Sequence, residues 1–230
     1  MERVSIIEGK KPIIIVSPHG FDDDDERTAL IAEAIANTLG CYAVINRGWE
    51  RADKVDVFND KADCNNVEHC HEDVVKDEFL DPIIRFRNRL RKSYTVVYMY
   101  MIHGMSNKHR TLCGDPKLDM VIGHGAGSPD SFTCDQWRKD CFIHLLGEAG
   151  LNVYEGKKGG AMSGWARQNM NQIWRKWYSD PSMQSMQIEI VHELRADNDI
   201  AALTAEYLAA AMDDMLGKGK YNGPTNTKRY

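Results

Sequence analysis

Two apolar stretches that each end in a His-Gly pair constrain this chain most strongly. They cover residues 12–20 and 95–104. Short β-rich runs of this kind, bounded by turn residues, are typical of buried strands. A histidine at the carboxyl end of such a strand lies on the rim of a sheet, where α/β proteins bind their ligands. We therefore expect His19 and His103 at one edge of a buried sheet.

The rest of the chain alternates between strand-like and helix-like patterns. Further strands are expected at residues 41–46, 118–123, 151–154 and 186–191. Helices are expected at residues 26–39 with Gly40 as the stop, at 80–92, from a cap at Ser131 or Thr133 to Gly150, and at 199–216. This alternation predicts an α/β sandwich with a largely parallel sheet. We expect one domain over residues 1–216 and a loose tail over residues 217–230.

Composition excludes several classes of protein. The 230 residues carry 29 basic and 34 acidic side chains, and this net charge of -5 argues against nucleic acid as the main partner. No apolar run approaches the roughly 18 residues that cross a bilayer, so no membrane partner is expected. The N-terminal segment lacks the apolar core of a signal peptide, and the six cysteines are irregularly spaced. We expect a cytoplasmic protein with reduced thiols.

An acidic run, residues 22–26, follows the first His-Gly pair at once. Zinc accepts imidazole nitrogen and carboxylate oxygen, and three protein ligands with an open fourth position form its catalytic site. Asp22 has the His-x-x-Asp spacing, whereas Asp24 suits a longer loop, so both are candidates beside His19 and His103. The alternative is a solvated helix N-terminus, which the helix dipole favours.

A glutamate lies inside the apolar strand-like segment near residue 190. Glu189 lies between Ile188 and Ile190 and points to the opposite face of the strand. Burying a carboxylate there costs free energy unless the group is paired or has a function. Hydrolysis by an activated water needs a carboxylate that takes a proton and returns it to the leaving group. Glu189 is the candidate for this general base, and a salt-bridged, half-exposed strand residue is the alternative.

Three arginines, Arg47, Arg51 and Arg167, are candidates for holding a substrate carboxylate or an oxyanion. The guanidinium fork matches a carboxylate with two parallel hydrogen bonds, although each of the three could equally be a surface residue. His124, which also follows a predicted strand, is a rival metal ligand, but its flanking glycines favour a tight turn. A second metal site from Cys64, His69, Cys70 and His71 has a spacing that fits no zinc module.

The chain resembles the N-formylglutamate amidohydrolase-like family in an ordered set of segments. They are residues 17–20, 31–36, 44–46, 103–105, 119–123, 158–160 and 186–190. The family is related in fold to the zinc carboxypeptidases, which implies a three-layer sandwich with a mixed, mostly parallel sheet between helices. The resemblance also implies one zinc ion, with His19 and His103 as ligands and Glu189 as general base.

Two further segments resemble regions of known function. Residues 51–60 are similar to the substrate-binding region of the family, which makes Asn59 a substrate-binding candidate beside Arg47. The loop 21–26 resembles that of poly-γ-glutamate hydrolases, where the acidic ligand lies further from the first histidine. This likeness keeps Asp24 beside Asp22.

Together these observations predict a zinc-dependent amidohydrolase that acts on a carbon–nitrogen bond other than a peptide bond. The expected substrate is a small acidic N-acyl amino acid or a γ-glutamyl compound, and a homo-oligomer is left open. The alternatives are a hydrolase of poly-γ-glutamate or another peptide-like polymer, a non-catalytic metal- or ligand-binding module on the same fold, and a metal-free globular protein.

Overall fold

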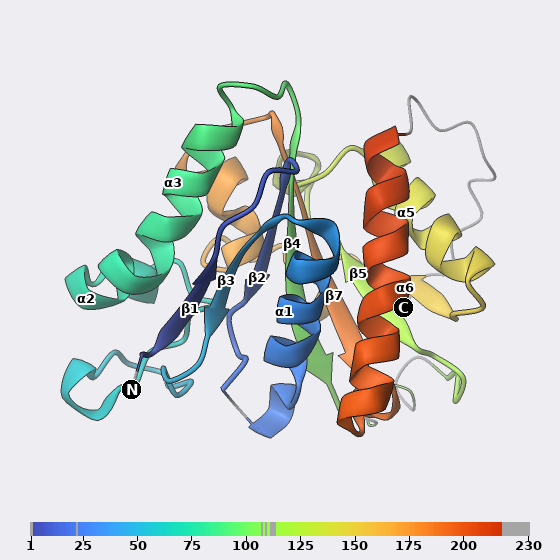
Figure 1. Ribbon diagram of the computed structural model, residues 1–230, viewed down its shortest axis with the longest axis horizontal. Helices are drawn as coiled ribbons and strands as arrows, with labels where there is room; N and C mark the ends of the chain where they lie inside the picture. Colours follow the sequence, from blue (N-terminus) through green and yellow to red (C-terminus); the bar gives the residue numbers. More distant parts are fainter. Residues whose placement is uncertain (1, 22, 107, 109, 111–113, 218–230) are drawn as a thin grey trace.

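A seven-stranded mixed sheet organises the molecule (Figure 1). The computed structural model describes residues 2–21, 23–106, 108, 110 and 114–217. The strands are β1 (Val4–Ile7), β2 (Ile13–Ser17), β3 (Tyr42–Asn46), β4 (Val97–Met105), β5 (Met120–Gly123), β6 (Val153–Glu155) and β7 (Met183–Val191), in the spatial order β1-β3-β2-β4-β7-β5-β6. Only the β1–β3 and β5–β7 pairs are antiparallel. The predicted mixed, mostly parallel sheet is confirmed.

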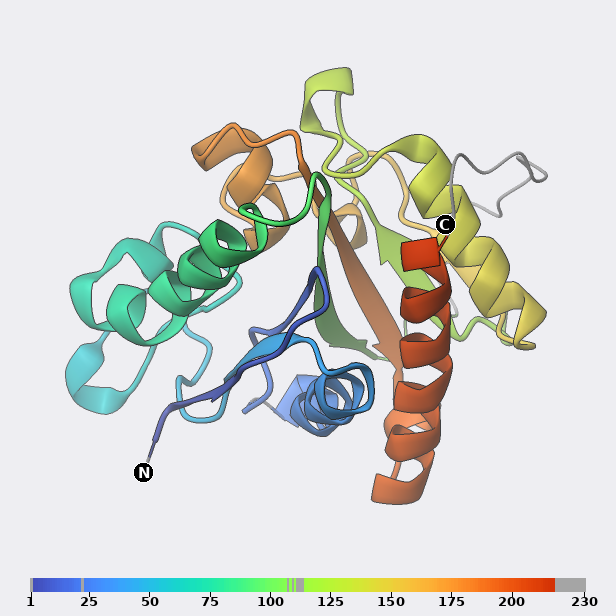
Figure 2. The same ribbon diagram turned by 45° about the horizontal axis from the view of Figure 1, so that its top comes forward.

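Helices cover both faces of this sheet. On one face lie α1 (Thr28–Leu39), α5 (Gln136–Glu148) and α6 (Asn198–Gly217), with α1 and α6 side by side (Figures 1 and 2). On the other lie the short α2 (Asp73–Val75), a π-helical turn at Lys76–Leu80, α3 (Asp81–Leu90) and a second π-helical turn at Ile173–Trp177. The three-layer α/β sandwich that the sequence predicted is therefore confirmed.

Burial on two faces explains why the central strands have continuous apolar sequences. In β2, Ile13 and Ile15 pack into the cluster under α1, while Ile14 and Val16 pack into the cluster under α3. All four are 0% exposed. Full burial of each such side chain contributes about 1.5–3 kcal/mol, which favours an apolar residue on either face of the strand.

Several element boundaries differ from the prediction. Ser131 does not cap a long helix, because it closes a one-turn 3₁₀ helix, Pro129–Ser131, where its hydroxyl accepts from the Ser128 backbone N–H. Helix α5 begins five residues later, after Asp135. Strand β1 was not predicted, because it is short and at the edge, with Ile6 41% exposed. Gly40 ends α1 as expected, in the left-handed conformation with φ 64°.

The last helix ends close to the predicted boundary between the domain and the tail. Helix α6 ends at Gly217, and the rest of the expected tail lies outside the described residues. Within the described ranges, no helix is both long and apolar enough to cross a membrane. The single-domain organisation and the cytoplasmic location stay predictions.

Strands β2, β4 and β7 are parallel neighbours, and this arrangement positions the candidate site. β2 pairs with β4, and β4 pairs with β7 along its whole length. Their carboxyl ends therefore meet at one edge of the sheet, which is where α/β folds bind ligands.

Candidate metal centre

His19, Asp25 and His103 form a buried cluster at this edge of the sheet. His19 follows β2, His103 lies near the end of β4, and Asp25 ends the one-turn 3₁₀ helix Asp23–Asp25. Asp25 Oδ2 lies 3.3 Å from His103 Nδ1 and 3.4 Å from His19 Nδ1. The two imidazole rings are T-shaped, with centroids 5.1 Å apart. The structure thus brings together the two histidines that the sequence singled out.

The donor atoms of this cluster fit a zinc ion. One ligand atom from each of the three residues lies within 4.8 Å of the others. Donors about 2.0–2.2 Å from a tetrahedral zinc are roughly 3.3–3.6 Å apart, which matches both carboxylate–imidazole distances. His103 Nδ1 contacts Asp25, whereas its Nε2 is buried and has no hydrogen-bond partner among the described residues. Two imidazoles and one carboxylate are a donor set that zinc prefers.

The acid between the two imidazoles is Asp25, which the sequence analysis did not select. Asp22 lies outside the described residues, and so does the side chain of Asp24. The 3₁₀ turn carries the chain back toward β4, and Thr28 Oγ1 fixes its end by donating to the Asp25 carbonyl at 2.8 Å. The His-x-x-Asp spacing favoured Asp22 and a longer loop favoured Asp24, and both predictions fall on side chains that are not described.

A second carboxylate, Asp63, contacts the far side of His19. Its Oδ1 lies 2.8 Å from His19 Nε2, and the same oxygen accepts from the Asn65 backbone N–H. The Asp63 backbone N–H in turn donates to His69 Nδ1 at 3.1 Å. A carboxylate on the outer nitrogen of a ligating histidine fixes the ring and raises its basicity. The sequence analysis missed Asp63, which lies in an irregular segment without a recognisable pattern.

The charges in the cluster depend strongly on one another. Burial on its own lowers the pKa of His19, but the hydrogen bonds to Asp25 and Asp63 outweigh it and raise this pKa to about 9. Burial also opposes ionisation of Asp25, yet its hydrogen bonds to His103 and His19 hold the pKa of that carboxyl well below its usual range. The two carboxylates thus favour the protonated form of His19 in the absence of a metal, and a bound cation would displace that proton.

Glu189 lies beside the cluster on the neighbouring strand. It is directly opposite His103 in the pairing of β4 with β7, and its Oε1 accepts from Gln187 Nε2 at 2.8 Å. Burial raises the pKa of Glu189 to about 7, although the charge of His103 opposes the rise. A carboxylate with a pKa near neutrality is suited to taking up and releasing a proton.

The predicted substrate-binding side chains lie among ordinary surface contacts. Arg47 pairs with Glu33 of α1 at 2.6 Å, and Asn59 donates to Asp56 at 2.7 Å. Arg51 is exposed, and the exposed Arg167 lies over the ring of Trp177 at 5.0 Å. None of these contacts tests a role in binding substrate, so the roles of these four residues stay predictions.

The rival metal ligands lie elsewhere in distinct surroundings. His124 follows β5, stacks on Phe132 with centroids 5.2 Å apart, and is so deeply buried that its pKa falls to about 4. Cys70 Sγ contacts the Cys64 carbonyl, and His71 stacks on Trp177. In the described part of the chain, only His19, Asp25 and His103 have the geometry of a metal site.

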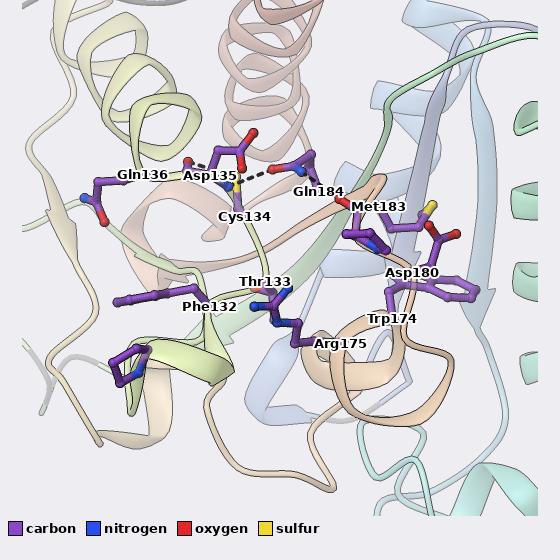
Figure 3. A pocket seen from close by; sticks show the side chains of 12 residues that line it. Phe132, Thr133, Cys134, Asp135, Gln136, Trp174, Arg175, Asp180, Met183 and Gln184 are labelled. Carbon is purple, nitrogen blue, oxygen red and sulfur yellow. Dashed lines mark hydrogen bonds between the residues drawn. The ribbon is translucent and has the colours of Figure 1, made fainter.

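The cavity in Figure 3 is separate from this centre. It has a volume of about 330 Å³ and lies at the amino end of β7, where Met183 and Gln184 line it. Gln184 Oε1 accepts from the Asp135 backbone N–H at 2.7 Å across this region (Figure 3). Gln184 lies five positions before Glu189 along the strand, a distance of roughly 16 Å.

The three-layer α/β sandwich of this chain is a fold that it shares with amidohydrolases and metallo-carboxypeptidases. No protein-family model matches this chain, and no curated protein does. Among solved structures, N-formylglutamate amidohydrolase from Ralstonia eutropha JMP134 is similar, with 13% identity and a TM-score of 0.57 over 95% of this chain and 100% of that one.

Two other solved structures have the same fold. A bacteriophage poly-gamma-glutamate hydrolase shares 11% identity at a TM-score of 0.56, covering 93% of this chain and 89% of the other. A metallo-carboxypeptidase from Burkholderia cenocepacia shares 11% identity at a TM-score of 0.52, covering 94% and 66%. These comparisons confirm the fold that the resemblance in sequence implied.

Proposed function

We propose that this protein is a zinc-dependent amidohydrolase that cleaves the amide bond of a small acidic N-acyl amino acid. The observation that carries the proposal is the buried group of His19, Asp25 and His103 with Glu189 opposite His103 on the next strand. The similarity in fold to an N-formylglutamate amidohydrolase supports the same class of reaction.

In this proposal, some residues of the chain bind the metal and another transfers the proton. His19, Asp25 and His103 would hold the ion, and Asp63 orients His19 from its outer nitrogen. Bound zinc supplies Lewis-acid chemistry, since it polarises a carbonyl and lowers the pKa of water towards about 7. Glu189 takes a proton from the attacking water and delivers it to the amide nitrogen as the C–N bond breaks. The products are a carboxylic acid and an amine.

The charge of the proposed substrate indicates which side chains could bind it. An acidic substrate needs a cationic partner, and Arg51 and Arg167 are the candidates for its carboxylate or for the oxyanion. Arg47 and Asn59 are further candidates for binding the substrate. Replacing each in turn by Ala identifies the partner, because loss of a substrate contact raises KM more than it lowers kcat.

Two measurements test the proposal together. The first is the zinc content of the wild type and of His19→Ala, for which we expect one ion per chain and a large loss. The second is hydrolysis of a panel of N-formyl and N-acetyl amino acids with acidic, neutral and basic side chains. Stoichiometric zinc without turnover of any acyl amino acid would identify a binding module instead. A wild type without zinc would overturn the metal-dependent function.

A second candidate is a hydrolase of γ-linked glutamyl chains. The position of Asp25, six residues after His19, is further along the chain than the His-x-x-Asp spacing, and a longer separation is the feature that resembles poly-γ-glutamate hydrolases. Similarity in fold to a bacteriophage enzyme of that name supports this candidate. Poly-γ-glutamate in the same assay distinguishes the two, because release of short γ-glutamyl products without cleavage of small N-acyl amino acids identifies the polymer as substrate.

A further inference from the structure

A buried arginine, Arg195, lies close enough to the candidate metal centre to interact with Asp25 and Glu189. Arg195 ends the 3₁₀ turn His192–Arg195 that follows β7, and it is only 2% exposed. A guanidinium in this position must satisfy its donors within the protein, because burying an unpaired charge is very costly. The hydrogen-bond acceptors of the Arg195 guanidinium therefore show which segments it connects.

Three backbone carbonyls from separate segments accept hydrogen bonds from this one guanidinium. Nε of Arg195 donates to the Ile190 carbonyl at 3.2 Å, and Nη1 donates to the Glu26 carbonyl at 2.8 Å. Nη2 reaches the Met105 carbonyl at 3.4 Å. The planar group thereby joins the end of β7, the loop before α1 and the end of β4.

Each of these carbonyls belongs to a residue one or two positions after a residue of the candidate site. Ile190 directly follows Glu189, Glu26 directly follows Asp25, and Met105 lies two positions after His103. Hydrogen bonds from Arg195 thus reach the segments that carry the proposed base and two of the proposed ligands.

Gly104 allows this close approach. A Cβ atom at position 104 would lie 2.6 Å from Arg195 Cζ and 2.6 Å from Nη2. Real Cβ atoms do not approach other atoms so closely, so any larger residue would displace the guanidinium. The glycine after His103 therefore serves the packing of Arg195 against β4.

The backbone of Arg195 is itself held in place. Thr204 Oγ1 of α6 donates to the Leu194 carbonyl at 2.6 Å, and Arg27 Nη1 donates to the Arg195 carbonyl at 3.2 Å. Because the turn is fixed to α6, the guanidinium acts from a rigid support.

We infer that Arg195 is a positioning residue that sets the spacing of Asp25, His103 and Glu189 through their backbone segments. The inference rests on the proposed zinc function for its consequence, since the spacing decides how tightly the ion binds. A lysine cannot replace Arg195, because a single ammonium group lacks the planar fork that reaches three separate carbonyls.

The main experiment compares Arg195→Lys and Arg195→Met with a matched control, Arg87→Met. Arg87 pairs with Asp180 at 2.9 Å beyond the opposite end of β7, so its loss removes a guanidinium remote from the centre. Zinc affinity is measured by competition with a chromophoric chelator, and Tm is measured on the metal-free protein. Residues that orient ligands typically change metal affinity by about 10–100-fold. We expect such a loss for both Arg195 variants and a change below about twofold for the control.

A second pair of variants covers the case in which the Arg195 variants fail to fold. Gly104→Ala keeps the charge of Arg195 but displaces its guanidinium, so we expect a similar loss of zinc affinity. In the Arg195→Met background the same alanine meets no guanidinium, and its additional effect on affinity should be much smaller. Equal effects of Gly104→Ala in the two backgrounds would show that the guanidinium is not what it displaces.

These outcomes separate the inference from the proposed function. If the wild type binds zinc but hydrolyses no amide, the amidohydrolase proposal fails while the affinity comparison still tests Arg195. If Arg195→Lys and Gly104→Ala bind zinc as tightly as the wild type, the positioning role is overturned whatever the activity. Failure of the wild type to bind zinc at all overturns both.

Discussion

His103 of β4 and Glu189 of β7 lie directly opposite each other in a parallel pair of strands. Paired residues in neighbouring strands point to the same face of the sheet, so the imidazole and the carboxylate share one surface. This relationship places a predicted metal ligand beside a predicted base through backbone pairing alone, without help from a loop.

The first prediction concerns Glu189→Gln. The amide keeps the size of the side chain but cannot take up a proton, and general base catalysis typically contributes about 10²–10⁴-fold. We expect kcat to fall by this order while one zinc ion stays bound, as measured by steady-state kinetics and metal analysis. Near-normal turnover of the variant would remove Glu189 from the mechanism.

The same variant should change stability with a definite pH dependence in the metal-free protein. The pKa of Glu189 is raised by burial from 4.5 to about 7, so the ionised form destabilises the fold. This penalty is absent below about pH 4.5 and complete above about pH 7, where it amounts to about 3 kcal/mol at most. We expect Glu189→Gln to have a higher Tm than the wild type at pH 8 and no such advantage at pH 4, as measured by calorimetry.

Zinc binding should depend on pH through His19. Its pKa is raised to about 9 in the metal-free protein, so at neutral pH the ring carries a proton that the ion must displace. Zinc affinity should therefore rise by up to about tenfold per pH unit from pH 7 and level off near pH 9. Calorimetry in buffers of different ionisation enthalpy measures the released proton directly. An affinity that is constant between pH 7 and 8.5 would contradict the charged state of His19.

The partner of His19 gives a further prediction. Asp63→Asn removes the negative charge from the outer nitrogen of the ring, where the carboxylate lies 2.8 Å away. We expect zinc affinity to fall by about 10–100-fold with little change in secondary structure. Asp56→Asn is the matched control, because this partly exposed aspartate lies in the same irregular segment and contacts Asn59 instead. An equal loss in the two variants would mean that the segment as a whole is sensitive.

Two glycines allow a paired test of how backbone conformation in and after the helices affects stability. Gly40 adopts φ 64° at the end of α1, whereas Gly147 lies within α5 without a positive φ, and neither has an atom within 4 Å of an added Cβ. Gly40→Ala should lower the free energy of unfolding by about 1 kcal/mol, because alanine resists the left-handed conformation. Gly147→Ala should raise it by about 0.5–1 kcal/mol, because alanine is the better helix former. Chemical denaturation of both variants measures these opposite shifts.

The parts of the site that lie on strands could be predicted from the sequence. His19, His103 and Glu189 each follow or belong to an apolar run, and burial in a parallel sheet leaves few alternatives for such a run. The parallel order then brings their positions to one edge. The apolar strand patterns were therefore sufficient to predict the fold and the positions of His19, His103 and Glu189.

The parts that lie on irregular backbone could not be predicted. Asp25 reaches the cluster through a single 3₁₀ turn, and Asp63 reaches it through a segment held by contacts such as Val67 N–H to the Gln168 carbonyl at 2.7 Å. Arg195 binds carbonyl groups, which every residue possesses and which leave no mark in the sequence. These positions depend on tertiary structure that no local pattern encodes.

The described donors come from parts of the chain that are far apart, with His103 separated from Asp25 by 78 positions. A partly folded chain has no means of holding these groups within reach of one ion. Binding of the proposed ion by all three groups would therefore require that the central strands have assembled. Uptake of the proposed ion would accordingly mark the native state of this protein.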